Sequence, residues 1–461
     1  MSARTSMHGM WSSHLAFVLA VTGSAVGLGN IWKFPYVAGA NGGGAFVIVY
    51  LACVVLIGLP IMMSEVLLGR RGRRNPIITM RDLGQEEAGQ RFWGLIGYSG
   101  VLAGILILSY YSVIAGWALA YLPRLATGVF TGADANTVAQ HFSNFIADPE
   151  ALLAWHTVFM VMTVLVVARG VEQGLERAVK FLMPALFILL LVMVGYAATT
   201  DGFAQGLEFL FTPDFSKIDG SVILVAMGQA FFSLSLGMGA VMTYGAYLPQ
   251  STSILNTSLT VVAADTAVAI LAGVAIFPIV FANGLDPAQG PGLIFQTLPL
   301  AFGQMGVTGT IFGTLFFVLL VFAGWTSSIG LIEPAVAWLV ETRNMTRAGA
   351  AWLVGGIIWV VGFATVASFN IGADFTFFAD ADGANGKTMF DVLDYLTSNI
   401  MLPLGGLLIA LFAGWVMCRN SSTEELAMGT GLRYQAWRLL ARFVAPAAVA
   451  LVFLNAVGLL G

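Results

Sequence analysis

Two glycine-rich interruptions lie inside otherwise apolar stretches of the sequence. The first runs from Gly23 to Asn30 and holds three glycines, and the second runs from Ser233 to Gly239 and holds two glycines and two serines. Irregular backbone at membrane depth persists only inside protein or beside a water-filled cavity. Unwound backbone frees carbonyl oxygens for cations, and the N-termini of half-helices offer N–H groups to a carboxylate. The pair therefore predicts a transporter binding site at mid-depth, and close helix packing is the alternative reading of either glycine cluster alone.

Oxygen ligands for a hard cation occur in two other apolar stretches. Asp265 lies in the run from Val261 to Phe277, and an intramembrane carboxylate marks a functional site by default because its charge is costly in lipid. Thr326 to Ser328 are three consecutive hydroxyl residues. They either offer oxygen to a cation or bond carbonyls of their own helix.

The chain lacks the residue pattern of an enzyme active site. Its four histidines form neither a catalytic set nor a metal cluster, and Cys53 and Cys418, in or beside apolar stretches, imply no disulfide framework. A channel would need a continuous polar pore, whereas the polar residues cluster at mid-depth. We therefore expect no enzyme, no organic cofactor and no nucleic-acid partner.

The composition makes lipid the main solvent of this chain. Of 461 residues, 58% are hydrophobic and 10% are charged, whereas a soluble domain carries about 25% charged residues. A helix needs about 20 apolar residues to cross the hydrocarbon. We predict eleven such spans, near residues 11–36, 44–69, 93–123, 151–168, 176–198, 221–247, 255–284, 306–341, 348–370, 390–417 and 436–459.

The basic residues predict the orientation of these spans. With the N-terminus in the cytoplasm, Lys33, Arg124, Lys217 and Lys387 fall in outer segments and the other basic residues in inner ones. Because cytoplasmic segments hold the excess of lysine and arginine, we expect the N-terminus inside and, after eleven spans, the C-terminus outside. No soluble domain is visible, so residues 1–461 are expected to form a single transmembrane domain.

At the interruptions the sequence resembles a known family. Gly27–Tyr36, Asn41–Phe46, the second interruption and Ala323–Ser328 are similar to motifs of the neurotransmitter:sodium symporter family. The resemblance implies an all-α polytopic membrane protein with the LeuT fold. In that fold, two inverted five-helix repeats contain discontinuous helices 1 and 6.

The same resemblance implies the layout of the repeats and the location of the protein. Repeat one would cover about 11–198 and repeat two about 221–417, with an eleventh helix at about 436–459. A chain with eleven helices resembles bacterial, MhsT-type hydrophobic amino-acid transporters. This resemblance implies that the protein lies in a bacterial inner membrane.

Two sodium sites are implied by the resemblance, with sodium as the co-transported ion. The first would be formed by the Ala25 carbonyl, Asn30, Ser233, Asp265 and the carboxylate of the substrate. The second would be formed by the carbonyls of Gly23, Val26 and Ala323 and the hydroxyls of Thr326 and Ser327. Chloride-dependent members have neutral residues near the position of Asp265, so this aspartate implies chloride independence.

The implied substrate is an amino acid. Its carboxylate would be held by Leu28, Gly29 and Tyr111, and its ammonium by carbonyls of Ala25, Phe232 and Ser233. The walls around its side chain would be Val26, Ile107, Phe232, Ser235, Met238, Ser328 and Leu331. None of these is charged, so a hydrophobic or aromatic side chain is expected. Met238 stands where several members have phenylalanine, and its flexibility favours a broad substrate range.

Gate residues are implied on both sides of this pocket. The outer gate would consist of Lys33, Asp394 and Gln229 above a lid of Phe232 and Tyr111. The inner gate would consist of Glu341 and Trp11, with His8 or Arg4 near the place of the usual basic partner.

Four further residues have implied roles, in spans five, two and eight. Gly174 and Pro184 would form a hinge that unwinds, or else a static kink. Glu65 would hold helix six through hydrogen bonds, with proton relay as the alternative. Glu333 would be a polar anchor.

Together these implications predict sodium-coupled uptake of a hydrophobic or aromatic L-amino acid by alternating access. The protein would act in the lipid bilayer as a monomer or a homodimer. The alternative is a transport-dead membrane sensor, which would bind an amino acid without accumulating it.

Overall fold

The computed structural model describes residues 7, 11–287, 292–378, 386–456 and 459. These residues are mainly helical. Isolated antiparallel β-bridges within the described chain join Gly43 to Pro213 and Phe377 to Lys387. Nine unbroken helices among them are long and apolar enough to cross a membrane.

Several of these nine spans contain a π-helical segment, labelled η. The spans are α3–η2–α4 (Gly44–Cys53, Val54–Gly58, Leu59–Gly72), α6 (Gly94–Ala126), α8 (Pro149–Ala168), η3–α9 (Val171–Glu176, Arg177–Ala197), α13 (Ile254–Ala282), α15 (Gly306–Arg343), α16 (Arg347–Ser368), α17–η6–α18–η7 (Met389–Asp394, Tyr395–Met401, Leu402–Leu411, Phe412–Val416) and α20–η8–α21 (Leu432–Leu439, Leu440–Val444, Ala445–Ala456).

Two further spans are broken. In span one, α1 (His14–Ala25) is followed by η1 (Gly29–Lys33) and α2 (Phe34–Ala40), and its two halves are bent by 47°. In span six, α11 (Gly220–Ser233) ends inside the bundle and α12 (Ala240–Ala246) follows. With the bent pair of span one counted as one span, the described residues contain ten helical segments long and apolar enough to cross a membrane, and α11 and α12, each too short to cross alone, occupy the remaining stretch predicted from hydropathy. Both breaks fall on the glycine-rich interruptions.

Three spans differ from the prediction by four residues or more at one end. Span one extends to Ala40 rather than residue 36, span five begins at Val171 rather than residue 176, and the last span begins at Leu432 rather than residue 436. Pro35 does not end span one, because it lies in the first turn of α2, where its missing N–H is tolerated.

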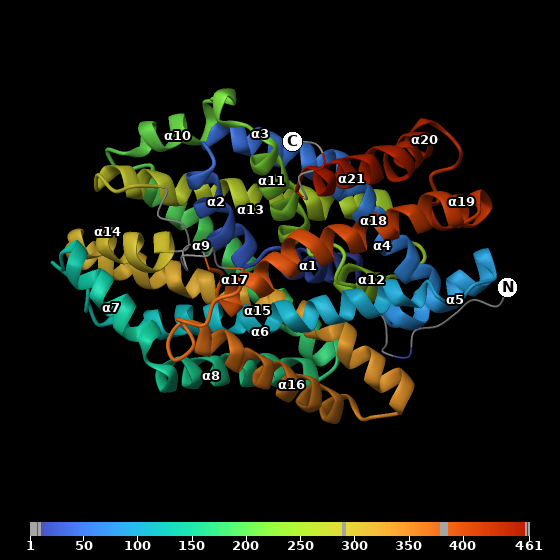
Figure 1. The fold of residues 1–461 in the computed structure, drawn as a ribbon, viewed down its shortest axis with the longest axis horizontal. Coiled ribbons are helices and arrows are strands. Elements are labelled where there is room, and N and C mark those ends of the chain that lie inside the picture. The colour runs from blue at the N-terminus through green and yellow to red at the C-terminus, as the bar shows by residue number, and fades with distance from the viewer. Residues whose placement is uncertain (1–6, 8–10, 288–291, 379–385, 457–458, 460–461) are drawn as a thin grey trace.

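Shorter helices lie at the two ends of the bundle (Figure 1). At one end are α7 (Ala135–Ala147), α10 (Phe203–Phe211) and α14 (Leu298–Gln304), the last preceded by η5 (Leu293–Thr297). A short 3-10 helix, η4 (Phe215–Lys217), follows α10. At the other end are α5 (Pro76–Ala88) and α19 (Arg419–Leu426). The first group belongs to segments predicted outside and the second to segments predicted in the cytoplasm.

Spans three and eight form the centre of the molecule. α15 packs against α6, α9 and α1, while α12 packs against α4. In their most apolar stretches 83% of α6 and 78% of α15 are buried, against 28% of the last span. The core therefore surrounds α6 and α15, and both broken spans lie against it.

Candidate functional site

The break in span one lies directly against spans three and eight. Val26 leaves the helix with extended backbone, at φ −70° and ψ 106°. A Cβ on Gly27 would lie 2.2 Å from Ser327 Oγ and 2.5 Å from Tyr111 Oη. Only glycine fits this contact, so the break is held close to these two hydroxyls.

The break in span six is fixed by hydrogen bonds from two other spans. Ser235 and Gly237 have positive φ angles of 54° and 79°, which glycine adopts at no steric cost. Gly237 N donates to Glu65 Oε1 over 2.7 Å, and Ser235 Oγ donates to the Ser24 carbonyl over 2.9 Å. Glu65 is fully buried and lies where a residue that holds helix six would be expected.

A small cavity, with about 10 Å³ of free volume, lies between the two breaks. Eight residues predicted for the substrate pocket line it: Ala25, Gly29, Ile107, Tyr111, Phe232, Ser235, Met238 and Leu331. Three residues not predicted for the pocket also line it: Ser24, Gly27 and Ser327. These three small residues lie where span one packs against α15. Their position on the cavity lining depends on how the two spans pack, which the sequence pattern does not reveal.

Four predicted pocket residues lie beside the cavity rather than on its lining: Val26, Leu28, Ser233 and Ser328. Leu28 N donates to Tyr111 Oη over 2.9 Å, and Ser328 Oγ donates to the Gly324 carbonyl of its own helix over 2.8 Å. The Ser328 bond is the within-helix alternative that the sequence left open for the three consecutive hydroxyls.

The residues predicted for the first sodium site form one buried cluster. Asn30 Nδ2 donates to Asp265 Oδ1 over 2.8 Å, and Ser233 Oγ donates to Asp265 Oδ2 over 3.1 Å. Ala25 lines the adjoining cavity. In the described part of the chain, no lysine or arginine forms an ion pair with Asp265. A buried carboxylate in this setting would be complemented by a cation.

The residues predicted for the second sodium site also lie together. Ser327 Oγ donates to the Val26 carbonyl over 3.2 Å and lies 3.5 Å from the Gly23 carbonyl oxygen. Thr326 Oγ1 donates to the Ala323 carbonyl of its own helix over 3.1 Å, so Thr326, like Ser328, forms the within-helix bond that the sequence left open. Carbonyl and hydroxyl oxygens from spans one and eight thus converge, as a hard cation requires.

The predicted outer gate is closed. Lys33 Nζ lies 2.7 Å from Asp394 Oδ1 and 4.5 Å from the centroid of the Phe232 ring. Gln229 lies deeper, where its Nε2 donates to the Gly29 carbonyl over 2.6 Å. The ion pair therefore sits above an aromatic lid of the cavity, and Gln229 holds the backbone of span one.

On the inner side, Glu341 binds the start of α5. Asn75 donates to its two carboxylate oxygens from the backbone N and from Nδ2, both over 2.9 Å. Asn75 also caps α5 by accepting from Ile77 N and Ile78 N. His8 and Arg4, the predicted basic partners of Glu341, lie outside the described residues.

Trp11 closes the inner end of the bundle against span six. Its Nε1 donates to the Tyr244 carbonyl over 3.3 Å, and the two rings meet edge to face with centroids 5.4 Å apart. Only 3% of Trp11 is exposed. The residue thus has the place expected of the aromatic side chain of an inner gate.

The predicted hinge residues lie on either side of the start of α9. Gly174 is in η3, and Pro184 is inside α9. A Cβ on Gly174 would lie 2.1 Å from the Val166 carbonyl oxygen. Glycine is therefore required for η3 to pack against the end of α8.

The family model described as "Sodium:neurotransmitter symporter family" matches residues 8–140 and 136–459. The chain belongs to the sodium:neurotransmitter symporter family. It is therefore a sodium-coupled multi-pass membrane transporter and not an enzyme.

Relatives of this symporter extend over nearly its full length. An uncharacterized sodium-dependent transporter of Bacillus subtilis, YhdH, is 40% identical, and the match covers 98% of each chain. An uncharacterized sodium-dependent transporter of Haemophilus influenzae is 33% identical, with 99% of each chain covered. A crystal structure of MhsT in complex with L-phenylalanine matches with a TM-score of 0.90 and 42% identity over 97% of this chain and 99% of that one. This likeness confirms the predicted fold class, while the bounds of the repeats stay a prediction.

Several residues that fix the symporter's site were not predicted from the sequence. Tyr50 Oη lies 3.1 Å from Ser233 Oγ, and Tyr110 Oη donates to Asp394 over 3.2 Å. Arg347 lies 2.5 Å from Glu333, which also accepts from Tyr247 Oη over 2.9 Å. The hydroxyl groups of Tyr50 and Tyr110 within apolar stretches were a signal that each needs a polar partner. The sequence does not identify these partners, because they are far away along the chain.

Proposed function

We propose that this symporter takes up a hydrophobic or aromatic L-amino acid together with sodium, and that it does not require chloride. The observation that carries the proposal is the lining of the cavity between the two breaks. Among the described residues that form it, none is charged, and Ile107, Phe232, Met238 and Leu331 supply apolar walls. The relative MhsT, with L-phenylalanine bound, supports the same substrate class.

The polarity of the cavity suits a free amino acid. Its free volume in this structure is about 10 Å³, far below the roughly 300–1,000 Å³ of pockets that hold a small molecule, so its walls would move apart to admit the substrate. Tyr111 Oη and backbone groups at the breaks lie beside apolar walls. The charged ends of an amino acid would bind the polar side, and its side chain would fill the apolar side.

Coupling to sodium would arise at Asp265, Asn30 and Ser233. A cation bound beside this cluster would also attract the substrate carboxylate, so that each ligand would favour binding of the other. Asp265 would supply the negative charge that a chloride ion would otherwise provide. The second set of oxygens, around Ser327, would bind a second sodium between spans one and eight.

Transport would proceed by alternating access between the two closed ends. The Lys33–Asp394 pair would open toward the outside, and the contact of Trp11 with Tyr244 would open toward the cytoplasm. This direction follows the predicted orientation in a bacterial inner membrane, with the N-terminus inside. Gly174 and Pro184 would allow span five to move when the inner end opens.

The test is uptake of radiolabelled tryptophan, leucine and phenylalanine into proteoliposomes under an inward sodium gradient, with chloride replaced by gluconate. The proposal expects accumulation that requires sodium and persists in gluconate. Uptake that stops in gluconate would contradict chloride independence, and uptake of none of the three would contradict the substrate class.

A transport-dead sensor is distinguished in the same preparation. Such a protein would bind a labelled amino acid in a sodium-dependent manner, without accumulation above the equilibrium level. The closed contacts at both ends of the cavity do not themselves separate the two functions, so equilibrium binding and flux are measured side by side.

A further inference from the structure

A surface groove with a volume of about 530 Å³ lies where spans four, five and eight meet. It shares no residue with the cavity between the two breaks. Its walls include Arg169, Gln173, Arg177, Phe181, Phe322 and Trp325. Phe181 is 68% exposed, so the groove faces the surroundings of the bundle.

The polar residues of the groove gather at one end. Arg169 directly follows α8, Gln173 lies in η3, and Arg177 is the first residue of α9. All three are exposed, and no hydrogen bond or ion pair in the described residues engages either guanidinium. Glu176, the nearby buried acid, is occupied by Ser12 and Lys180. Two positive charges therefore face the groove without a protein partner.

The apolar residues lie farther along the spans. Phe181 is one helical turn beyond Arg177, about 6 Å deeper toward the centre of span five. Its ring lies 6.4 Å from that of Phe322 on α15, and Trp325 extends the same wall one turn away. The groove is thus cationic at its end and apolar along its depth.

We propose that this groove binds an anionic phospholipid of the cytoplasmic leaflet. The phosphate would lie between Arg169 and Arg177, because guanidinium groups form charge-assisted hydrogen bonds with phosphate oxygens. The acyl chains would lie against Phe181, Phe322 and Trp325. Anionic lipids of this leaflet attract basic residues near the membrane surface.

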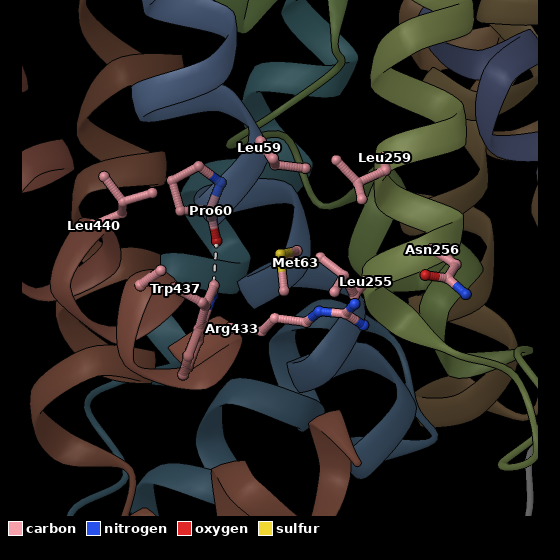
Figure 2. Close-up of a pocket in the computed structure, with 10 residues that line it drawn as sticks. Leu59, Pro60, Met63, Leu255, Asn256, Leu259, Arg433, Trp437 and Leu440 are labelled. Atoms are coloured by element: carbon pink, nitrogen blue, oxygen red, sulfur yellow. Dashed lines mark hydrogen bonds between the residues drawn. The ribbon is translucent and has the colours of Figure 1, made fainter. Parts of the chain in front are cut away.

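A second surface groove lacks this combination. Figure 2 shows it beside α4, α13 and α20, where Arg433 extends toward Met63 and Leu255. The other labelled residues that line it are uncharged. A single arginine cannot hold a phosphate from two sides, so we assign the lipid to the groove with the arginine pair.

The lipid would act on the hinge of span five. Gly174 lines the same groove and lies in η3, between the two arginines in the sequence. A headgroup bound to both would join the end of α8 to the start of α9 across this segment. Anionic lipid would then hold η3 in its packed position. This inference does not depend on the proposed substrate. It depends on the groove described above and on the predicted orientation, which places Arg169 and Arg177 on the cytoplasmic side.

The experiment uses the full-length protein and measures lipid adducts by native mass spectrometry with phosphatidylglycerol or phosphatidylcholine. The test variant is Arg169→Gln/Arg177→Gln. The control is Arg91→Gln/Arg343→Gln, which removes two exposed arginines from segments predicted on the same face. Because the test variant would remove both direct charge-assisted hydrogen-bond donors to the phosphate, we expect it to lose on the order of tenfold in phosphatidylglycerol affinity. The control arginines do not line the groove and would not contact the phosphate, so the control should stay within about twofold of the parent protein.

Equal phosphatidylcholine adducts and an unchanged thermal midpoint in the test variant would show that it is folded, so that its loss is specific. Undiminished phosphatidylglycerol binding by this variant would overturn the proposal. An equal loss in the control would do the same, because it would indicate general surface charge. Displacement of phosphatidylglycerol by equimolar glycerol phosphate would also overturn it, since the groove would then bind an anion rather than a lipid.

Discussion

Asn30 donates from Nδ2 to the Asp265 carboxylate over 2.8 Å and thereby joins the break of span one to span seven. Neither side chain is exposed, and the two residues are 235 positions apart in the sequence. Ser233, at the end of α11, donates to the other carboxylate oxygen. Three spans thus meet at a single buried acid, whose charge should matter for ion coupling.

Replacement of this acid by Asp265→Asn is expected to reduce sodium-dependent uptake in gluconate by at least tenfold. A hydrogen bond to a charged group contributes about 1.5–3 kcal/mol, and about 1.4 kcal/mol corresponds to a factor of ten. Chloride should restore part of the activity by replacing the lost charge. Asp374→Asn, at an exposed acid, is the control and should leave uptake unchanged. Equal uptake by Asp265→Asn with and without chloride would contradict the role proposed for this aspartate.

The two neighbouring serines of span eight should differ in their effect on sodium. Ser327 bonds across to span one, whereas Ser328 bonds its own helix. We expect Ser327→Ala to raise the sodium concentration for half-maximal uptake by roughly fivefold, since a lost hydrogen bond or ligand costs about 0.5–1.5 kcal/mol. Ser328→Ala should change it by less than about twofold. The measurement is uptake against sodium concentration, and equal shifts in the two variants would argue against a second sodium site at Ser327.

Gly174→Ala tests the packing of the hinge. The new Cβ would lie 2.1 Å from the Val166 carbonyl oxygen, and overpacking of this kind costs about 1–3 kcal/mol. Hydrogen–deuterium exchange should therefore become faster in residues 171–176, together with a fall in uptake. Gly195→Ala is the matched control in the same span, because a Cβ there meets nothing within 4 Å. Unchanged exchange in Gly174→Ala would mean that η3 moves aside without cost.

The local features of this site could be predicted because lipid makes them costly. Glycines and hydroxyls in an apolar run, or the carboxylate of Asp265, stand out against their neighbours and need a compensating role. The breaks in spans one and six followed from this signal, and the family resemblance then supplied the pocket residues.

Contacts between distant spans could not be predicted from the same pattern. Asn75 binds Glu341 across 266 positions, and Tyr50 meets Ser233 across 183. Hydrophobic period and length identify each helix but do not fix which polar groups face one another. Such pairs depend on helix rotation and packing, which only the assembled bundle determines.

Met238 gives a test of substrate range. It lines the cavity, and a larger, stiffer ring in Met238→Phe should exclude the bulkiest substrates. We expect unlabelled tryptophan to compete about tenfold less well against labelled phenylalanine, because overpacking costs about 1–3 kcal/mol, while leucine competes nearly as before. Met238→Leu conserves volume and should keep both affinities. Equal weakening of tryptophan and leucine in Met238→Phe would indicate a general loss of the pocket instead.

The pair of Glu333 and Arg347 gives a prediction about stability. Glu333 is fully buried, and Arg347 has 16% of its side chain exposed, with 2.5 Å between their charged atoms. Arg347→Met would leave the carboxylate without its basic partner, and removal of one member of a buried pair costs about 3–5 kcal/mol. The thermal midpoint in detergent should fall accordingly. The double variant Glu333→Gln/Arg347→Met should recover most of this loss, because no buried charge remains. If both variants unfold at the same temperature, the loss comes from the packing and backbone bonds of Arg347, such as its Nε bond to the Val167 carbonyl, rather than from the ion pair.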